Sequence, residues 1–184
     1  MGRKHEVNLS VEPQPINERY RVRKHQGDGV VELEKIRGDL YVNGKVVNFF
    51  ISEGQKRGVR TPGFEVLEEL KNTGGIGQNY AMLVYLYDHS ELLPDNLRAP
   101  SGKQGSSNGP NIYFPGTIFA PTCEPDPQSS QHGVDDWICG FEFVTGMGLG
   151  IITAKLCCDW GASCRPGEPS EVKALSGAMA YIIG

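Results

Sequence analysis

A short polar turn that follows an aromatic segment carries residues able to transfer protons. Asp88 and His89 come directly after the run that ends at Tyr87, and Glu91 lies two positions further on. A carboxylate and an imidazole at the mouth of a cavity can act as general acid and general base. Aspartate is also an ordinary turn residue. The pattern makes Asp88 and His89 candidate catalytic residues, with a plain turn as the alternative.

Glu142 is a carboxylate inside an otherwise apolar segment, residues 137–144. If its face of a strand is buried, the carboxylate needs a partner or a raised pKa, and either would mark a site. If the face is exposed, Glu142 is an ordinary outward polar residue. We favour the exposed alternative and keep Glu142 as a third catalytic candidate.

Aromatic residues recur on the segments that we expect to be strands. A core needs such residues for packing alone, but an aromatic cavity with a few polar groups is also typical of a small-molecule site. The candidate ligand-binding residues are Tyr85, Tyr87, Trp137, Phe141 and Phe143.

The sequence carries no metal or cofactor motif that we can identify. His132, Asp135 and Asp136 form the densest group of possible ligands, but their spacing matches no EF-hand loop. Residues 146–150 are glycine-rich, yet they lack the spacing and the following helix of a dinucleotide fingerprint. We therefore expect no metal and no cofactor.

Five cysteines lie in the last third of the chain and form no Cys-x-x-Cys pair. Their odd number leaves at least one thiol without an intramolecular disulfide partner. We expect free thiols, with a disulfide between Cys158 and Cys164 as the alternative. The five residues are Cys123, Cys139, Cys157, Cys158 and Cys164.

Charge and hydropathy narrow the class of protein. The net charge of −4 argues weakly against nucleic-acid binding. Arg19, Arg21 and Arg23 alternate, so a strand would carry them on one face, which is typical of a charged sheet edge. No apolar run reaches the length of a membrane-spanning helix, and the first residues do not resemble a signal peptide. We expect a soluble, cytoplasmic protein, while a secreted form without its signal stays open.

The composition predicts a β-rich fold. The chain contains 24 glycines and 12 prolines in 184 residues, which divide it into short pieces. We expect an all-β or β-dominated antiparallel barrel or sandwich of roughly eight to ten strands. One short helix is expected at about 62–72, with Thr61 as its cap. Residues 1–18 are predicted to be an extended arm and residues 19–184 a single domain.

Local patterns place several of these elements. Asn43-Gly44 between two β-rich runs predicts a tight hairpin. Residues 80–87 are apolar on both alternating faces, and we interpret them as a strand covered on both sides. Residues 94–110 and 121–136 are predicted to be long loops.

These expectations lead to three hypotheses about function. The first is a β-barrel that binds an apolar small molecule in its interior, with the two long loops at the mouth. The second is a cofactor-independent cyclase or isomerase on the same scaffold. Such an enzyme acts mainly by shaping its substrate, so its sequence need not contain a recognisable motif. The third is a non-catalytic interaction or assembly protein, for example a homo-oligomer, that uses the outer face of residues 80–87.

Overall fold

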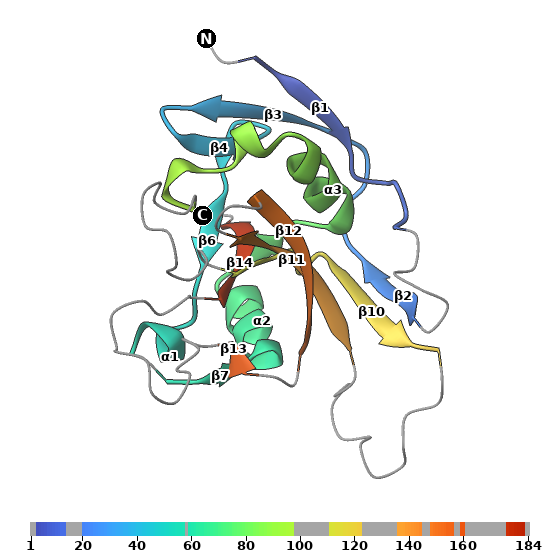
Figure 1. The fold of residues 1–184 in the computed structure, drawn as a ribbon, viewed down its shortest axis with the longest axis vertical. Helices are drawn as coiled ribbons and strands as arrows, with labels where there is room; N and C mark the ends of the chain where they lie inside the picture. Colours follow the sequence, from blue (N-terminus) through green and yellow to red (C-terminus); the bar gives the residue numbers. More distant parts are fainter. Residues whose placement is uncertain are drawn as a thin grey trace.

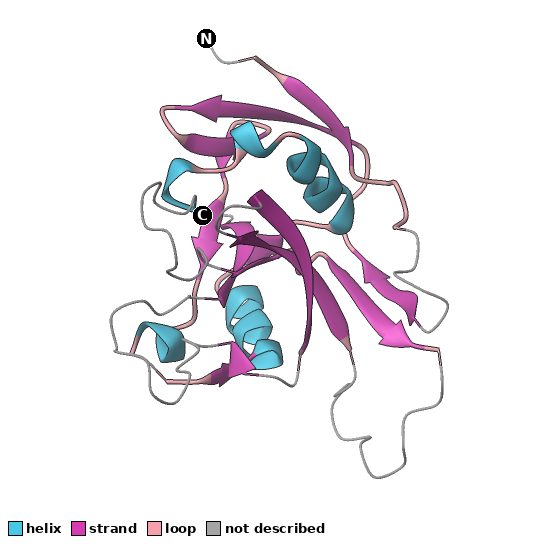
Figure 2. Cartoon of the chain, viewed as in Figure 1, coloured by secondary structure: helices cyan, strands magenta, loops and turns pink. Residues whose placement is uncertain are grey.

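β-Strands dominate the computed structural model of this chain (Figures 1 and 2). The structure describes residues 3–13, 20–57, 59–97, 111–122, 136–144, 148–156, 159–160 and 176–182. In these ranges the chain forms fourteen strands, three α-helices and two 3₁₀ helices. The β-dominated class predicted from composition is confirmed, and the described residues form no closed barrel.

The elements alternate irregularly along the chain. The strands of the first half are β1 His5–Asn8, β2 Tyr20–His25, β3 Val30–Ile36, β4 Asp39–Val42, β5 Lys45–Val46, β6 Asn48–Phe50, β7 Thr61–Pro62 and β8 Gly75–Gly77. The helices are α1 Glu53–Lys56, α2 Gly63–Asn72 and α3 Tyr80–Asp88, followed by the 3₁₀ helices Ser90–Leu92 and Asp95–Leu97. The second half contributes β9 Asn111–Tyr113, β10 Thr117–Pro121, β11 Trp137–Val144, β12 Gly148–Lys155, β13 Asp159–Trp160 and β14 Ser176–Ile182.

The smaller sheet is an antiparallel meander with the strand order β1-β3-β4-β5. The predicted hairpin at Asn43-Gly44 is confirmed, because both residues have positive φ, at 48° and 75°, as a type I′ turn requires. A second turn of this kind joins β3 to β4, where Arg37 and Gly38 have φ of 53° and 94°. β1, from the segment predicted to be an extended arm, pairs with β3 along its whole length.

The larger sheet has the order β2-β10-β11-β9-β14-β6, with β12 on β11 and β8 on β14. Its pairs are antiparallel except β9 with β14. β2 lies at one end of this order, and its Arg21 and Arg23 side chains are exposed. A charged edge strand of this kind discourages pairing with other chains.

α2 occupies the region in which a helix was predicted, but Thr61 does not cap it. The N-cap is Pro62, and no side-chain hydrogen bond is made there. Thr61 instead pairs with Trp160 in a two-stranded ladder, and its hydroxyl donates to the carbonyl oxygen of Val59. The backbone pairing with β13 thus holds Thr61 one residue before the cap.

The prediction of a strand at residues 80–87 is wrong, because this segment forms the helix α3. The side chain of Asn79 accepts a hydrogen bond from the backbone N–H of Met82 and so caps the helix. Met82, Leu83 and Leu86 are completely buried. The segment is apolar at almost every position, including the exposed Val84 and Tyr87, and in such a run alternation cannot distinguish helix from strand.

The larger sheet separates two cores. The main core gathers residues of β1, β3, β4 and α3 against one face of the sheet, and a second, smaller core lies under α2. Cys139 belongs to the first core and Ile138 to the second, so β11 is buried on both faces in this region. Figure 1 shows α3 between the smaller sheet and β11, with α2 further down the molecule. β11, not residues 80–87, is therefore the strand covered on both sides.

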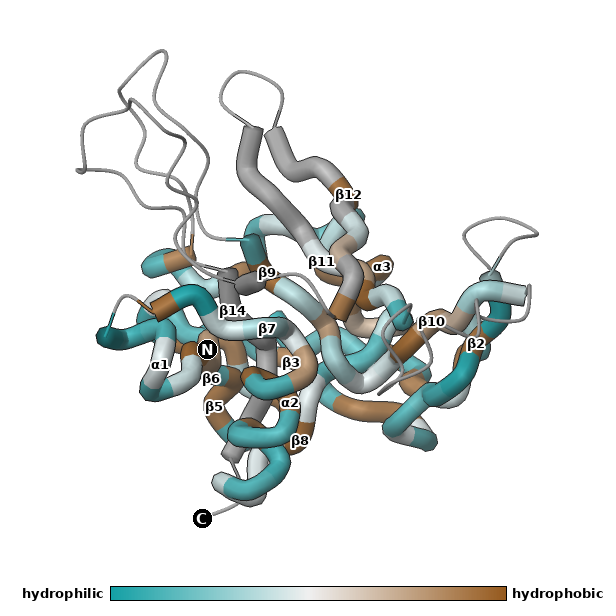
Figure 3. Tube along the Cα trace, turned by 90° about the horizontal axis from the view of Figure 1, so that it is seen from below, coloured by the Kyte–Doolittle hydropathy of each residue, from teal (hydrophilic) through white to brown (hydrophobic). Residues whose placement is uncertain are grey.

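Hydropathy differs between these elements. In Figure 3 apolar colouring marks β6 and part of α3, whereas α1 is hydrophilic. Among the described residues, no helix is both long enough and apolar enough to cross a membrane.

Candidate functional site

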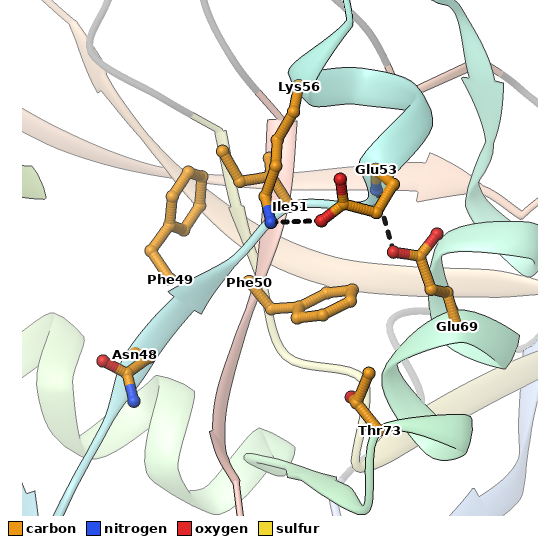
Figure 4. A pocket seen from close by; sticks show the side chains of 8 residues that line it. All are labelled: Asn48, Phe49, Phe50, Ile51, Glu53, Lys56, Glu69 and Thr73. Carbon is orange, nitrogen blue, oxygen red and sulfur yellow. Dashed lines mark hydrogen bonds and ion pairs between the residues drawn. The ribbon is translucent and has the colours of Figure 1, made fainter.

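A pocket of about 350 Å³ opens between β6, α1 and α2 (Figure 4). Small-molecule sites in proteins typically enclose about 300–1,000 Å³, so this pocket has the size of a site for a small ligand. Its lining combines aromatic and aliphatic walls with a few polar groups. The lining residues are Asn48, Phe49, Phe50, Ile51, Glu53, Lys56, Glu69 and Thr73.

A capping box positions the start of α1 above the end of β6. Ser52 accepts a hydrogen bond from the backbone N–H of Gln55, and the Gln55 side chain accepts one from the backbone N–H of Ser52. Both residues are buried. Because this reciprocal pair fixes the turn of the chain, Glu53 and Lys56 stand beside the aromatic residues of β6 (Figure 4).

The polar side of the pocket connects α1 to α2. Lys56 Nζ donates to Glu53 Oε1 at 2.5 Å, and the backbone N–H of Glu53 donates to Glu69 Oε1 at 2.8 Å. The hydrogen bond and the positive charge of Lys56 hold the pKa of Glu53 below its usual value. Glu69 thus satisfies an N–H at the first turn of α1, where helical N–H groups lack partners of their own.

The apolar walls of the pocket are the aromatic residues of β6. Phe49 packs against the main core, and Phe50 packs against the second core and against Leu70 of α2. Both rings are only partly buried, so part of their surface is open to the pocket. Thr73 closes the far end of the lining, and its hydroxyl donates to the carbonyl oxygen of Leu70.

The turn predicted to carry catalytic residues forms a cluster of rings at the end of α3. His89 lies against Tyr85, with ring centroids 4.4 Å apart, and its Nδ1 is 3.4 Å from Glu91 Oε1. His5 of β1 completes the cluster: its Nδ1 is 2.9 Å from the Tyr85 hydroxyl, and its ring centroid is 5.4 Å from that of His89. Asp88, in contrast, is exposed and takes no part in these contacts.

This cluster stands on the surface and shares no residue with the pocket. A hydrogen bond within Glu91 itself, and then the neighbouring His89, hold the pKa of the Glu91 carboxyl below its usual value. The side chain of Glu91 is 65% exposed, which leaves its charge well solvated. The cluster ties β1 to α3 through edge-on ring contacts of His5 and one hydrogen bond, and we assign it this positioning role.

The predicted ligand-binding aromatics are dispersed. Tyr87 is exposed at 42%, and Trp137 packs edge-on against Tyr20 with centroids 5.8 Å apart. Neither of them lines the pocket. Phe141 and Phe143 lie on β11, as does the catalytic candidate Glu142, but these three side chains lie outside the part of the structure that is described.

A buried hydrogen-bond network joins the start of α3 to β2 and β10. His25 Nε2 donates to the carbonyl oxygen of Leu9 at 2.8 Å, and its Nδ1 lies 2.9 Å from the Thr117 hydroxyl. Asn79 Nδ2 donates to the same carbonyl of Leu9 and to that of Gln26, each at 3.0 Å. Since these groups are fully engaged with one another, the network serves to position α3.

Cys139 is buried, and loss of hydration raises the pKa of its thiol to about 12. A thiol that stays protonated is a poor nucleophile, so Cys139 is a core residue. The remaining cysteines, and with them the alternative Cys158–Cys164 disulfide, lie outside the described residues.

Of the possible metal ligands His132, Asp135 and Asp136, the structure describes Asp136 alone. Asp136 accepts a hydrogen bond from Arg23 at 2.7 Å, whereas His132 and Asp135 lie outside the described residues, as do most of the two predicted loops. Among the described residues no group of three or more His, Cys, Asp or Glu side chains is arranged to hold a metal ion.

Sequence reasoning missed the pocket. Its residues come from the adjacent elements β6 and α1 and from α2 further along the chain, and none of them carries a ligand-binding motif. The readable signal was Ser52 followed three positions later by Gln55, a capping-box spacing that places a helix start directly after the apolar run 49–51.

Comparison with known proteins leaves the pocket as the main evidence on function. No family model, no curated protein and no solved structure matches this chain.

Proposed function

We propose that this protein binds a small, largely apolar molecule in the pocket between β6, α1 and α2. The observation that carries the proposal is a hollow of about 350 Å³ with the rings of Phe49 and Phe50 on its walls and ionic groups on one side. Apolar walls supply affinity through buried surface, and a few polar groups orient the ligand.

The proposed binding mode requires neither a closed barrel nor a sandwich. β6 is the terminal strand in the order of the larger sheet, and the pocket forms where α1 and α2 meet this strand. The ligand would therefore enter at the edge of the sheet, not through a barrel mouth.

Binding is tested by an NMR screen of small aromatic and aliphatic compounds against ¹⁵N-labelled protein. Ligands of the pocket are expected to shift the amide resonances of Ile51, Glu53 and Thr73. Replacing Thr73 by tryptophan should fill the pocket and abolish these shifts. Asn72→Trp is the matched control, because Asn72 is exposed, precedes Thr73 and is not part of the lining. Binding that survives Thr73→Trp unchanged would place the ligand elsewhere and refute the proposal.

The same screen addresses the enzyme alternative, a cofactor-independent cyclase or isomerase. Such an enzyme needs an acid or base next to the bound molecule. The carboxylates of Glu53 and Glu69 are the groups at the pocket able to serve in this way. A ligand recovered with an altered structure, detected by chromatography and mass spectrometry, would favour catalysis over binding alone.

A further inference from the structure

The charges that line the pocket are unbalanced. Glu53 and Glu69 are acidic, and Lys56 is the one basic residue of the lining among the described residues. Lys56 is already engaged with Glu53 at 2.5 Å. Arg57, the next residue, is not part of the lining, and its Nε donates to the backbone carbonyl oxygen of Glu53. The lining itself therefore carries an excess of one negative charge, which the nearby Arg57 partly offsets because its charge also acts on Glu53.

Glu69 provides an unused acceptor. Its Oε1 accepts the backbone N–H of Glu53, and its Oε2 makes no hydrogen bond within the described part of the chain. Figure 4 shows the carboxylates of Glu53 and Glu69 on the same side of the Phe50 ring. A positive group placed at Glu69 Oε2 would thus lie close to an aromatic wall.

An anionic ligand and a cationic ligand would affect these contacts differently. An anion could accept one of the two remaining N–H groups of Lys56, but it would then share the pocket with the carboxylates of Glu53 and Glu69, which repel it. A cation would bind at Glu69 and leave every existing contact intact. It would also gain a favourable interaction with the faces of Phe49 or Phe50, because aromatic rings attract cations.

We propose that the ligand of this pocket is an amine that is positively charged at neutral pH and attached to an aromatic or alkyl group. Its ammonium group binds the carboxylate of Glu69, and its apolar part contacts Phe49 and Phe50. This inference rests on the proposed function, since it names the class of molecule that the same pocket takes.

Three probes of nearly equal size separate charge from apolar contact: 2-phenylethylamine, 2-phenylethanol and 3-phenylpropanoate. NMR titration at pH 7 and low ionic strength gives a Kd for each. Probes of about nine to eleven non-hydrogen atoms are expected to bind in the millimolar range. The amine should bind about two- to fivefold more tightly than the alcohol, as expected for a partly exposed ion pair. The anion should bind most weakly, and added salt should reduce the advantage of the amine.

Glu69→Gln removes the charge but keeps an oxygen that can accept the N–H of Glu53. In this variant the amine should lose its advantage, while the Kd of the alcohol stays the same. Glu68→Gln is the matched control, because Glu68 is an exposed residue of the same helix and is not part of the lining. Unchanged amide spectra away from the pocket would show that both variants keep the fold.

The outcomes separate this inference from the function on which it rests. Equal affinity for amine and alcohol, or tighter binding of the anion, would overturn the amine inference and leave small-molecule binding standing. If none of the probes shifts the pocket resonances, the proposed function falls, and the amine inference falls with it.

Discussion

Replacing Asn79 by alanine tests whether the buried network described above holds α3 in place. Asn79 is 1% exposed, and its side chain makes hydrogen bonds to the backbone of three residues. Its oxygen accepts from the N–H of Met82 at 3.1 Å, and its amide nitrogen donates to the carbonyl oxygens of Leu9 and Gln26 at 3.0 Å each. Alanine removes all three at once.

The expected loss follows from these contacts. An N-cap contributes about 1 kcal/mol, and each of the two other hydrogen bonds contributes about 0.5–1.5 kcal/mol net. Asn79→Ala should therefore lower the free energy of unfolding by about 2–4 kcal/mol. For a chain of this length, that loss corresponds to a decrease in Tm of about 5–15 °C.

Asn79→Asp distinguishes a side chain that only caps α3 from one that also holds the hydrogen-bond network together. Aspartate keeps the acceptor for Met82, and its negative charge is favourable at a helix N-terminus. It cannot donate, however, and it would place a carboxylate against the carbonyl oxygens of Leu9 and Gln26. We expect Asn79→Asp to be destabilised by about 2 kcal/mol, because a buried charge that faces two carbonyl oxygens is costly even with the Nε2 of His25 3.4 Å from the replaced nitrogen.

Equilibrium urea unfolding, followed by far-ultraviolet circular dichroism, measures both variants. Asn72→Ala serves as the control, since Asn72 is an exposed residue at the end of α2. An Asn79→Asp variant as stable as the original protein would refute the argument, because the side chain would then act as a cap alone.

Three further predictions concern other parts of the fold. Gly116→Ala should destabilise the protein by about 2 kcal/mol, measured by urea unfolding, because a Cβ at this position would lie 2.8–2.9 Å from backbone atoms of residues 77–79. Gly29 has open space around it, so Gly29→Ala should destabilise the protein by about 1 kcal/mol through its positive φ alone. In a variant whose one remaining cysteine is Cys139, a thiol reagent at pH 8 should react only on unfolding, since burial raises the pKa of that thiol to about 12; rapid labelling of the native protein would contradict this. Lys56→Met should raise the pKa of Glu53 toward its ordinary value of 4.5, measured by carboxyl ¹³C NMR, because Lys56 is what lowers it; an unchanged titration would show that the ion pair is absent in solution.

Features that depend on a few adjacent residues could be predicted from the sequence. The Asn43-Gly44 turn was predicted and is confirmed, because positive φ is a property of a few adjacent residues. A helix was predicted at about 62–72 and lies at 63–72, with its N-cap at Pro62 instead of Thr61. The β-dominated class followed from the glycine and proline content.

Residues 80–87 show where sequence reasoning failed. Their apolar side chains fit a strand covered on both faces and a buried helix equally well. Asn79, a preferred N-cap residue, was the local sign of the helix, but its second role is not local. The carbonyl groups that it binds lie 70 and 53 residues away, at Leu9 and Gln26.

The candidate sites depended on tertiary structure to different degrees. His89 was a catalytic candidate from the sequence, a role that stays a prediction; its contact with His5 could not be predicted, because His5 comes from a strand more than 80 residues away along the chain. The pocket was not foreseen at all, because Phe50, Glu53 and Glu69 have ordinary side chains that become a site only where β6, α1 and α2 meet. Backbone conformation is decided largely by neighbours along the chain, whereas a cavity is decided by which distant segments pack together and by the space that they leave.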